Sequence, residues 1–190
     1  MISLRFTDNN NIRFSDAVAI LGEGKARQAF ARGVNRTGDK ARTVTIRALA
    51  KQVGLTQAKV RAFGAIRTIR ARPSAAIEYR IESTGSEIPL KEFSARQFGY
   101  GVRAKPWGVS RRFDSAFIFA GTPGSGKFVS AGDVFVRTSS ASYPIKRMFG
   151  PSIPKEIVQD ESAEAFQDAA MDLGQRIAHE VRVITKGIVS

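Results

Sequence analysis

The sequence predicts an α+β fold with a central antiparallel sheet, and three observations support this prediction. Small and apolar residues recur at steps of three and four in the first third of the chain. Between residues 65 and 140, short stretches alternate apolar and polar residues. Helical spacing then returns after residue 155. We therefore expect a long N-terminal helix, a short helix, β-hairpins and a C-terminal helix packed on the sheet.

The length and composition are those of a globular protein. With 190 residues, 43% hydrophobic and 25% charged, the chain is expected to form one domain with its own core. Cysteine is absent, which excludes disulfides, thiolate metal sites and a cysteine nucleophile. The N-terminus has no apolar segment typical of a secretory signal, and there is no 18-residue apolar run. We therefore predict no membrane contact.

The first 24 residues contain signals for a strand and for a helix. Apolar and polar residues alternate from Ile2 to Phe6, as in a short strand. The polar run at residues 8–11 is typical of a turn. Ser15 can cap a helix, which Gly22 and Gly24 are expected to break or kink.

A helical seam follows and predicts one long helix from about Lys25 to Gln52. Its inward residues are spaced by 4, 3, 4, 3 and 4, and the seam passes through Gly38 without losing phase. Gly54 is a typical C-terminal stop, and Thr56 can cap a second helix over about 57–63. The seam consists of Phe30, Val34, Thr37, Ala41, Val44 and Ala48.

From residue 65 the hydrophobic period changes to two, which predicts strands. Ala75–Glu82 is the clearest candidate, since Ile77, Tyr79 and Ile81 share one face. Pro73 and Ser74 form a turn before it. The other candidates are Ala65–Arg72, Phe93–Phe98, Val102–Lys105, Arg112–Ala120 and Phe128–Thr138, and the last two are expected to form a hairpin around the glycine-rich loop Gly121–Gly126.

The last third is divided by a proline-rich connector over 141–154, in which we expect no regular structure. Apolar residues at helical spacing then predict a C-terminal helix over 155–187. The single domain at 1–190 would thus contain a basic helical segment (25–64), a β-rich segment (65–140), the connector and this helix.

The charge of +13 is concentrated in one part of the chain. Lys25–Arg72 holds 13 basic residues and one acid, Asp39, whereas residues 155–172 hold six acids and one base. A polyanion or an acidic protein surface is therefore an expected partner of the basic segment. The candidate contact residues are Arg32, Arg36, Lys40, Arg42, Arg47, Lys51, Lys59, Arg61 and Arg67.

Residues 46–65 also match the spacing of a helix-turn-helix motif. Ala50 would let two helices approach and Gly54 would allow the sharp turn. Gln57, Lys59 and Arg61 could then contact bases, with Arg67 on a phosphate. A DNA-binding regulator is therefore the alternative function. A packing corner at the end of a scaffold helix has the same spacing, and the length of the preceding helix favours the corner.

A second motif resembles a phosphate-binding loop. Gly121–Lys127 satisfies the G-x-x-x-x-G-K spacing, but Phe128 stands where a metal-binding hydroxyl is needed. Pro123 removes an amide, and the following residues have strand character rather than helical character. We therefore interpret the loop as a hairpin tip and predict no cofactor.

Two further residues are candidates for a functional role. His179 is the only histidine, and one imidazole without a second ligand or a cysteine indicates a surface or packing role rather than metal binding or catalysis. Trp107, with Arg111 and Arg112 nearby, could stack on bases, but we favour a core position in a hairpin.

Four stretches in order resemble the minor tail protein Z family of long-tailed phages and prophages. They are NRTGDKARTVTIRALAKQVGL (35–55), PWGVSRRF (106–113), PIKRMFGPSIPKE (144–156) and RIAHEVR (176–182). The resemblance covers residues 25 to 182. It implies a non-catalytic structural or assembly protein of the virion, made in the host cytoplasm and acting in tail completion near the head-proximal end.

The resemblance also implies the partners. They would be other tail proteins, namely the tail terminator, the tape measure or the tube. The basic and acidic helices of one chain suit repeated head-to-tail contact, which closes into rings. We therefore expect a homo-oligomeric ring that matches a six-fold tail, and possible nonspecific contact between the basic segment and DNA in the tail channel.

Overall fold

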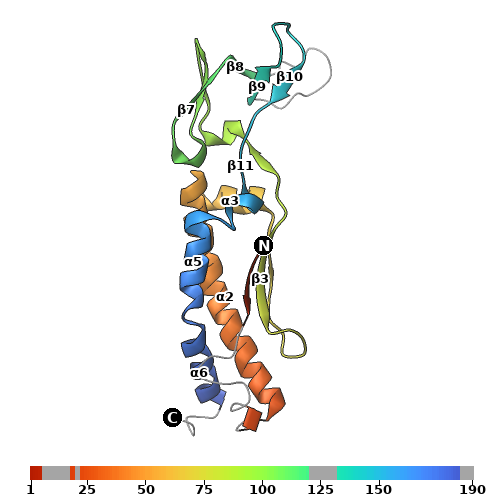
Figure 1. Ribbon diagram of the computed structural model, residues 1–190, viewed down its shortest axis with the longest axis vertical. Coiled ribbons are helices and arrows are strands. Elements are labelled where there is room, and N and C mark those ends of the chain that lie inside the picture. The colour runs from red at the N-terminus through yellow and green to blue at the C-terminus, as the bar shows by residue number, and fades with distance from the viewer. Residues whose placement is uncertain (6–17, 20–21, 120–131, 185–190) are drawn as a thin grey trace.

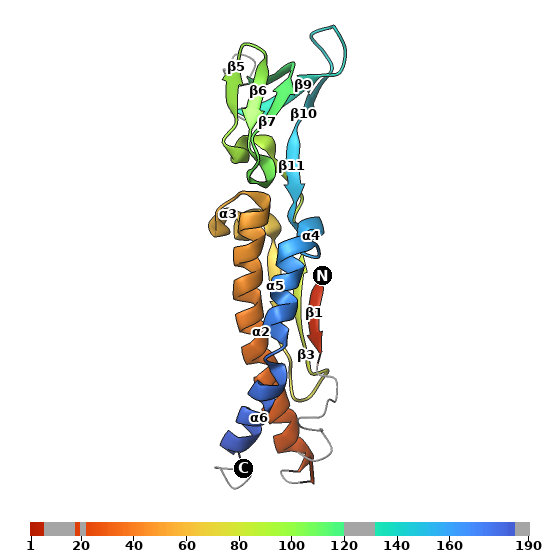
Figure 2. The ribbon, with the colours of Figure 1, turned by 60° about the vertical axis from the view of Figure 1, so that its left-hand side comes forward.

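The computed structural model describes residues 1–5, 18–19, 22–119 and 132–184. The predicted turn at 8–11, the cap at Ser15 and the loop Gly121–Gly126 lie outside these residues. The molecule is elongated (Figure 1): a long helix is flanked by C-terminal helices and a small sheet, and most strands gather at the other end. Figure 2 shows the same division from another side. The predicted α+β class is confirmed.

The long helix α2 spans Glu23–Val53, as the seam predicts. Phe30, Val34, Thr37 and Ala41 on that seam are all buried. The helix ends at Gly54, which adopts a left-handed conformation (φ 75°) and donates its N–H to the carbonyls of Ala50 and Lys51. The predicted stop is therefore confirmed.

The short helix α3 spans Gln57–Gly64, close to its predicted range. Thr56 caps it, with its hydroxyl accepting a hydrogen bond from the Lys59 amide at 3.4 Å. The chain reverses after Gly64 because Ala65 takes a left-handed conformation.

A three-stranded antiparallel sheet in the order β1-β3-β2 flanks α2. It contains β1 (Ile2–Arg5), β2 (Ile66–Ile69) and β3 (Glu78–Ser83). Tyr79 and Ile81 of β3 are fully buried. The Tyr79 ring packs directly on Gly38 of α2, where a Cβ would lie 2.3 Å from the ring. The glycine in the middle of the helix is therefore required by the close approach of the sheet.

The other end of the molecule consists of three small antiparallel sheets. One contains β5 (Arg96–Phe98), β6 (Gly101–Ala104) and β7 (Arg111–Asp114). A second contains β8 (Ala116–Phe119), β9 (Asp133–Arg137) and β10 (Ile145–Arg147). In the third, β4 (Glu87–Pro89) pairs with β11 (Phe149–Ser152). The predicted pairing of Arg112–Ala120 with Phe128–Thr138 is confirmed as β8 with β9.

Two predicted strands differ from the structure. The stretch Arg112–Ala120 is divided into β7 and β8 by Ser115, whose φ of 60° turns the chain from one sheet into another. The stretch Phe93–Phe98 begins in a 3-10 helix, η1 (Leu90–Phe93), and only its end is β5. A second 3-10 helix, η2 (Pro106–Gly108), connects β6 to β7.

The prediction that the connector lacks regular structure is wrong. Residues 141–154 contain β10 and β11 and the start of α4 (Ile153–Glu156). Pro144 precedes β10, and Pro151 lies where the β11–β4 register shifts between Phe149 and Ser152. These positions need no amide in a regular ladder, so the prolines are tolerated.

The predicted single C-terminal helix is also wrong, since this part comprises α4, α5 (Asp160–Ala170) and α6 (Leu173–Ile184). Residues 157–159 separate α4 from α5, whose first residue, Asp160, has a φ of 47°, and Met171 and Asp172 form a turn before α6. Both α5 and α6 pack along α2 rather than on the sheet. Gly33 of α2 permits this contact, because a Cβ there would lie 2.7 Å from the Ile177 side chain.

One cluster of buried apolar side chains extends through both ends of the molecule. It includes Phe30 and Leu49 of α2, Ile177 of α6, and Val102 and Val134 of the β-rich end. No helix among the described residues is long and apolar enough to cross a membrane.

Candidate functional site

Three of the predicted polyanion-contact residues on α2 face the C-terminal helices and form ion pairs with them. Arg36 Nη1 lies 2.5 Å from Glu180 Oε1, and Lys51 Nζ lies 3.3 Å from Glu161 Oε2. Lys40 pairs with Asp172, and this hydrogen bond holds the pKa of the Asp172 carboxyl below its ordinary value. The basic and the acidic helices therefore compensate each other within one chain.

This pairing changes the argument for head-to-tail contact. Of the acids at 155–172, Glu161 and Asp172 already form ion pairs with α2 of their own chain. Glu180 is almost fully buried, so its carboxylate cannot serve a second molecule without leaving Arg36. A ring that used Glu161, Asp172 or Glu180 would first have to break these pairs.

The remaining candidates on α2 have different surroundings. Arg32 and Arg47 are exposed and form none of the ion pairs that join described residues. Arg42 is half-buried and lies near the phenol of Tyr79. Arg32 and Arg47 are thus the exposed α2 candidates that can contact a partner without first breaking an ion pair between described residues.

The helix-turn-helix spacing corresponds to a packed corner at the end of α2. A Cβ at Gly54 would lie 2.3 Å from the Gly108 amide nitrogen, so the turn packs directly against η2. Lys59 is held by Glu92, with Nζ 2.8 Å from Oε2, and Gln57 is half-buried. Arg61 is exposed, with a weak 3.5 Å hydrogen bond to Gln57. The corner joins the helical part to the β-rich end.

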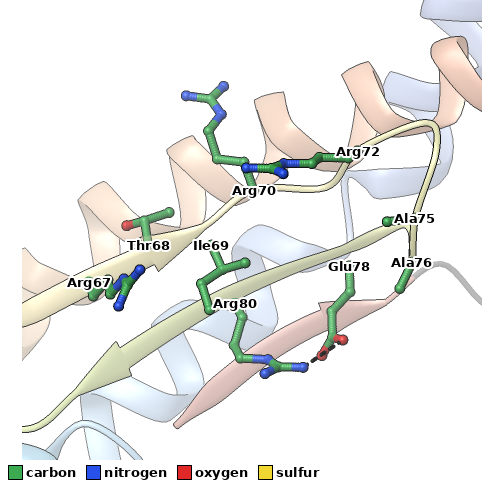
Figure 3. Close-up of a pocket in the computed structure, with 9 residues that line it drawn as sticks. All are labelled: Arg67, Thr68, Ile69, Arg70, Arg72, Ala75, Ala76, Glu78 and Arg80. Atoms are coloured by element: carbon green, nitrogen blue, oxygen red, sulfur yellow. Dashed lines mark hydrogen bonds and ion pairs between the residues drawn. The ribbon is translucent and has the colours of Figure 1, made fainter.

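A depression of about 580 Å³ lies on the β2–β3 hairpin and is lined by four arginines (Figure 3). Two of them are paired: Arg70 with Asp39 at 2.9 Å, and Arg80 with Glu78 at 3.0 Å. Arg67 and Arg72 are exposed, and neither forms an ion pair with another described residue. The lining residues are Arg67, Thr68, Ile69, Arg70, Arg72, Ala75, Ala76, Glu78 and Arg80.

Asp39, the one acid of the basic segment, connects α2 to this hairpin. Its carboxylate accepts hydrogen bonds from Arg70 and from the Tyr79 hydroxyl, both at 2.9 Å. Burial and the bond to Asp39 raise the pKa of Tyr79 to about 12. The Tyr79 phenol therefore stays protonated and donates its hydrogen bond to Asp39. Tyr79 and Asp39 thus both have a structural role. Of the paired groups in the depression, Arg70 holds the hairpin on α2 through Asp39, whereas the Arg80–Glu78 pair lies within β3.

His179 and the loop Gly121–Lys127 are two further candidates from the sequence. His179 is exposed on α6, in agreement with the predicted surface position. The described residues contain no cluster of three or more His, Cys, Asp or Glu side chains suited to a metal ion. The loop Gly121–Lys127 lies outside the described residues.

The core position predicted for Trp107 is wrong. Its side chain is 38% exposed, its Nε1 donates to Glu156 Oε1 at 2.9 Å, and the Arg111 guanidinium lies 5.1 Å from its ring centroid. The left-handed conformation of Trp107 (φ 55°) turns the ring out of the hairpin and toward α4.

Sequence reasoning missed a group of cations on the β5–β6–β7 sheet. Arg96, Arg103 and Arg112 occupy directly opposite positions on three adjacent strands. Consecutive members lie 7 and 9 residues apart in the sequence, and only the strand register brings them together. The alternation of arginine and aromatic residues in this region is visible in the sequence. The sequence prediction, however, considered stacking on bases for Trp107 alone.

Comparisons with models of protein families, with curated proteins and with solved structures gave no match to this chain. We therefore base the functional proposal on the sequence motifs and on where they lie in the structure.

Proposed function

We propose that this protein is a structural or assembly component of a bacteriophage tail, related to the minor tail protein Z family, that acts in tail completion near the head-proximal end. In this proposal the protein is a structural component and catalyses no reaction. The observation that carries it is that the motif stretches which resemble the family contact one another in three dimensions.

Three of the four motifs meet where the helical part joins the β-rich end. Gln52, from the first motif, donates to the Glu156 carboxylate of the third at 2.9 Å. Trp107, from the second motif, donates to the other oxygen of the same carboxylate. Gly54 and Gly108 lie in contact beside them. The motif residues therefore determine how the two parts are joined.

The fourth motif meets the first along α2. Ile177 packs on Gly33 near the start of the first motif, and Glu180 pairs with Arg36 inside it. In a structural protein the function depends on the shape of the fold. We therefore expect its motif residues to form contacts between distant elements. This supports a fold-level relationship rather than a chance similarity of short stretches.

The elongated shape is consistent with a component that spans between neighbours in an assembly, since one end is helical and the other is β-rich (Figures 1 and 2). We propose the tail terminator, the tape measure or the tube protein as neighbours, and a homo-oligomeric ring matched to the six-fold tail. The mature protein would reside in the virion.

The decisive experiment is to delete the gene from the phage or prophage that carries it and to image the particles. We expect filled heads and tails that fail to form complete virions, with restoration by the gene supplied in trans. In wild-type particles, a tagged copy should be detected at the head-proximal end of the tail. Normal virion yield after deletion, together with absence of the tagged protein from particles, would refute the proposal.

The helix-turn-helix regulator predicts a different result. It would bind one duplex target about 10³-fold or more tightly than bulk DNA. A gel shift with fragments of the same genome distinguishes the two functions. Because Lys59 is tied to Glu92 and Gly54 packs on Gly108, no observation in this corner favours the regulator.

A further inference from the structure

The sheet formed by β5, β6 and β7 carries a row of arginines on one face. Arg96 is directly opposite Arg103, and Arg103 is directly opposite Arg112, so the three side chains share a face. All three are exposed. Neighbouring strands lie about 4.8 Å apart, so the row spans roughly 10 Å. Figure 2 shows these strands side by side at the end opposite α6.

The opposite face of the same sheet supplies the core. Val102 and Ala104 on β6 alternate with Arg103 and are almost fully buried. Burial of these inward residues therefore explains why the sheet folds. Like charges placed directly opposite each other on adjacent strands destabilise a sheet, so the arginine row is a cost to folding.

Aromatic rings offset part of this cost. Phe98 and Tyr100 stack with ring centroids 5.4 Å apart, and the Arg103 guanidinium lies 5.0 Å from the Phe98 centroid. The Arg112 guanidinium lies 3.9 Å from the Tyr100 centroid, and it also pairs with Asp114. These contacts orient the guanidinium groups over the sheet.

A depression of about 470 Å³ adjoins the row. It is lined by Ser94, Arg96, Phe98, Arg103, Lys105 and Ser110. Three of these side chains are cationic, the two hydroxyls can donate hydrogen bonds, and none is acidic. Between residues 94 and 114 there are five basic residues and one acid, Asp114. This chemistry is complementary to an anion with several acceptor oxygens.

We propose that the β5–β6–β7 face binds the phosphodiester backbone of nucleic acid without reading its sequence. A row of cations suits successive phosphates of a polymer, and guanidinium groups held beside aromatic rings are typical of surfaces that bind single strands. Arginine and aromatic residues are also common in protein interfaces, so an acidic protein surface is the alternative that the competition experiment below separates from nucleic acid. The proposal rests on this face alone and does not depend on the tail assignment.

The test measures binding of a labelled oligonucleotide of about 20 nucleotides by fluorescence anisotropy at several salt concentrations. The variant Arg96→Gln/Arg103→Gln/Arg112→Gln removes three charges from the row. The matched variant Arg32→Gln/Arg47→Gln/Arg67→Gln removes three exposed charges from α2 and β2. Circular dichroism and thermal melting establish that both variants fold.

We expect the row variant to bind at least about tenfold more weakly at low salt, with the slope of log K against log salt reduced by about 2–3. The matched variant should lose clearly less affinity. Equal losses in the two variants, or a larger loss in the matched one, would overturn the proposal. So would a polyglutamate of equal charge that competes as well as the oligonucleotide, since this would indicate an acidic protein partner.

Discussion

At the scale of single residues, the glycines inside α2 have different roles that the helix itself does not explain. Glycine destabilises a helix interior by up to about 1 kcal/mol relative to alanine. At Gly38 the Tyr79 ring occupies the place of a side chain, whereas a Cβ at Gly24 would meet nothing within 4 Å. The same substitution should therefore have opposite effects at these two positions.

We predict that Gly38→Ala lowers the free energy of unfolding by roughly 2 kcal/mol or more, because the buried Tyr79 ring must move. Gly24→Ala should raise it by at most about 0.5 kcal/mol through helix propensity, because Gly24 lies in the first turn of α2. Urea titrations followed by circular dichroism measure both. A stabilising Gly38→Ala would mean that β3 does not pack on α2 as described.

The Tyr79–Asp39 hydrogen bond predicts a pH dependence. Burial and this bond raise the pKa of Tyr79 to about 12, above its ordinary value of 10. The stability gained from the protonated phenol is therefore fully present below pH 10 and is lost as the pH rises from 10 toward 12. The loss is of the order of 2–3 kcal/mol.

Denaturant titrations between pH 8 and pH 12 test this for wild type and Tyr79→Phe. The variant should lose about 1 kcal/mol at pH 8, from the missing hydrogen bond, and should show a flatter profile above pH 10. Parallel profiles for the two proteins would show that another group controls alkaline unfolding.

At the scale of elements, hydrophobic periodicity predicted α2 and α3 almost to the residue, because their seams and end signals are local. The connector at 141–154 was mispredicted because its strands depend on distant partners: β11 pairs with β4, about 60 residues earlier. The C-terminal helix was predicted as continuous because the apolar residues keep helical spacing across Met171 and Asp172, where the chain turns between α5 and α6.

The candidate site was predictable only in part, for the same reason. Composition showed that residues 25–72 are basic, but the partners of Arg36, Lys40 and Lys51 lie more than 100 residues away in sequence. In the folded chain these three cations form ion pairs within the molecule. The arginine row on β5–β6–β7 depends on strand register, which charge counts do not contain.

The α2–α6 contact gives a prediction about these charges. Arg36→Gln leaves the buried Glu180 carboxylate without its cation and should cost about 1–3 kcal/mol. Lys51→Gln breaks a pair that is exposed on both sides and should cost at most about 0.5 kcal/mol. Thermal melting compares them, and Arg36→Gln/Glu180→Gln should recover part of the loss. Equal costs for Arg36→Gln and Lys51→Gln would contradict the role of burial.

At the scale of the whole molecule, the internal compensation of charge determines what can hold the proposed ring together. Glu161 of α5, Glu180 of α6 and Asp172 between these helices pair with α2, so this part of the attraction between oppositely charged helices already acts within each chain. Large apolar side chains remain exposed along the C-terminal part: Met171 is 78% exposed and Val183 is 54% exposed. Contacts of this kind depend little on salt.

We therefore predict that the oligomer, measured by light scattering at high protein concentration, persists when salt is raised from about 0.05 M to 0.5 M, beyond the range of unscreened surface attraction. Met171→Glu should weaken it by placing a charge in an apolar contact, whereas Lys51→Gln should leave it unchanged. Because Met171 lies at the exposed turn between α5 and α6, its substitution should spare the fold, which melting verifies. Dissociation by salt would instead assign the contact to exposed charges such as Arg32 and Arg47, and a monomer under all conditions would refute the ring.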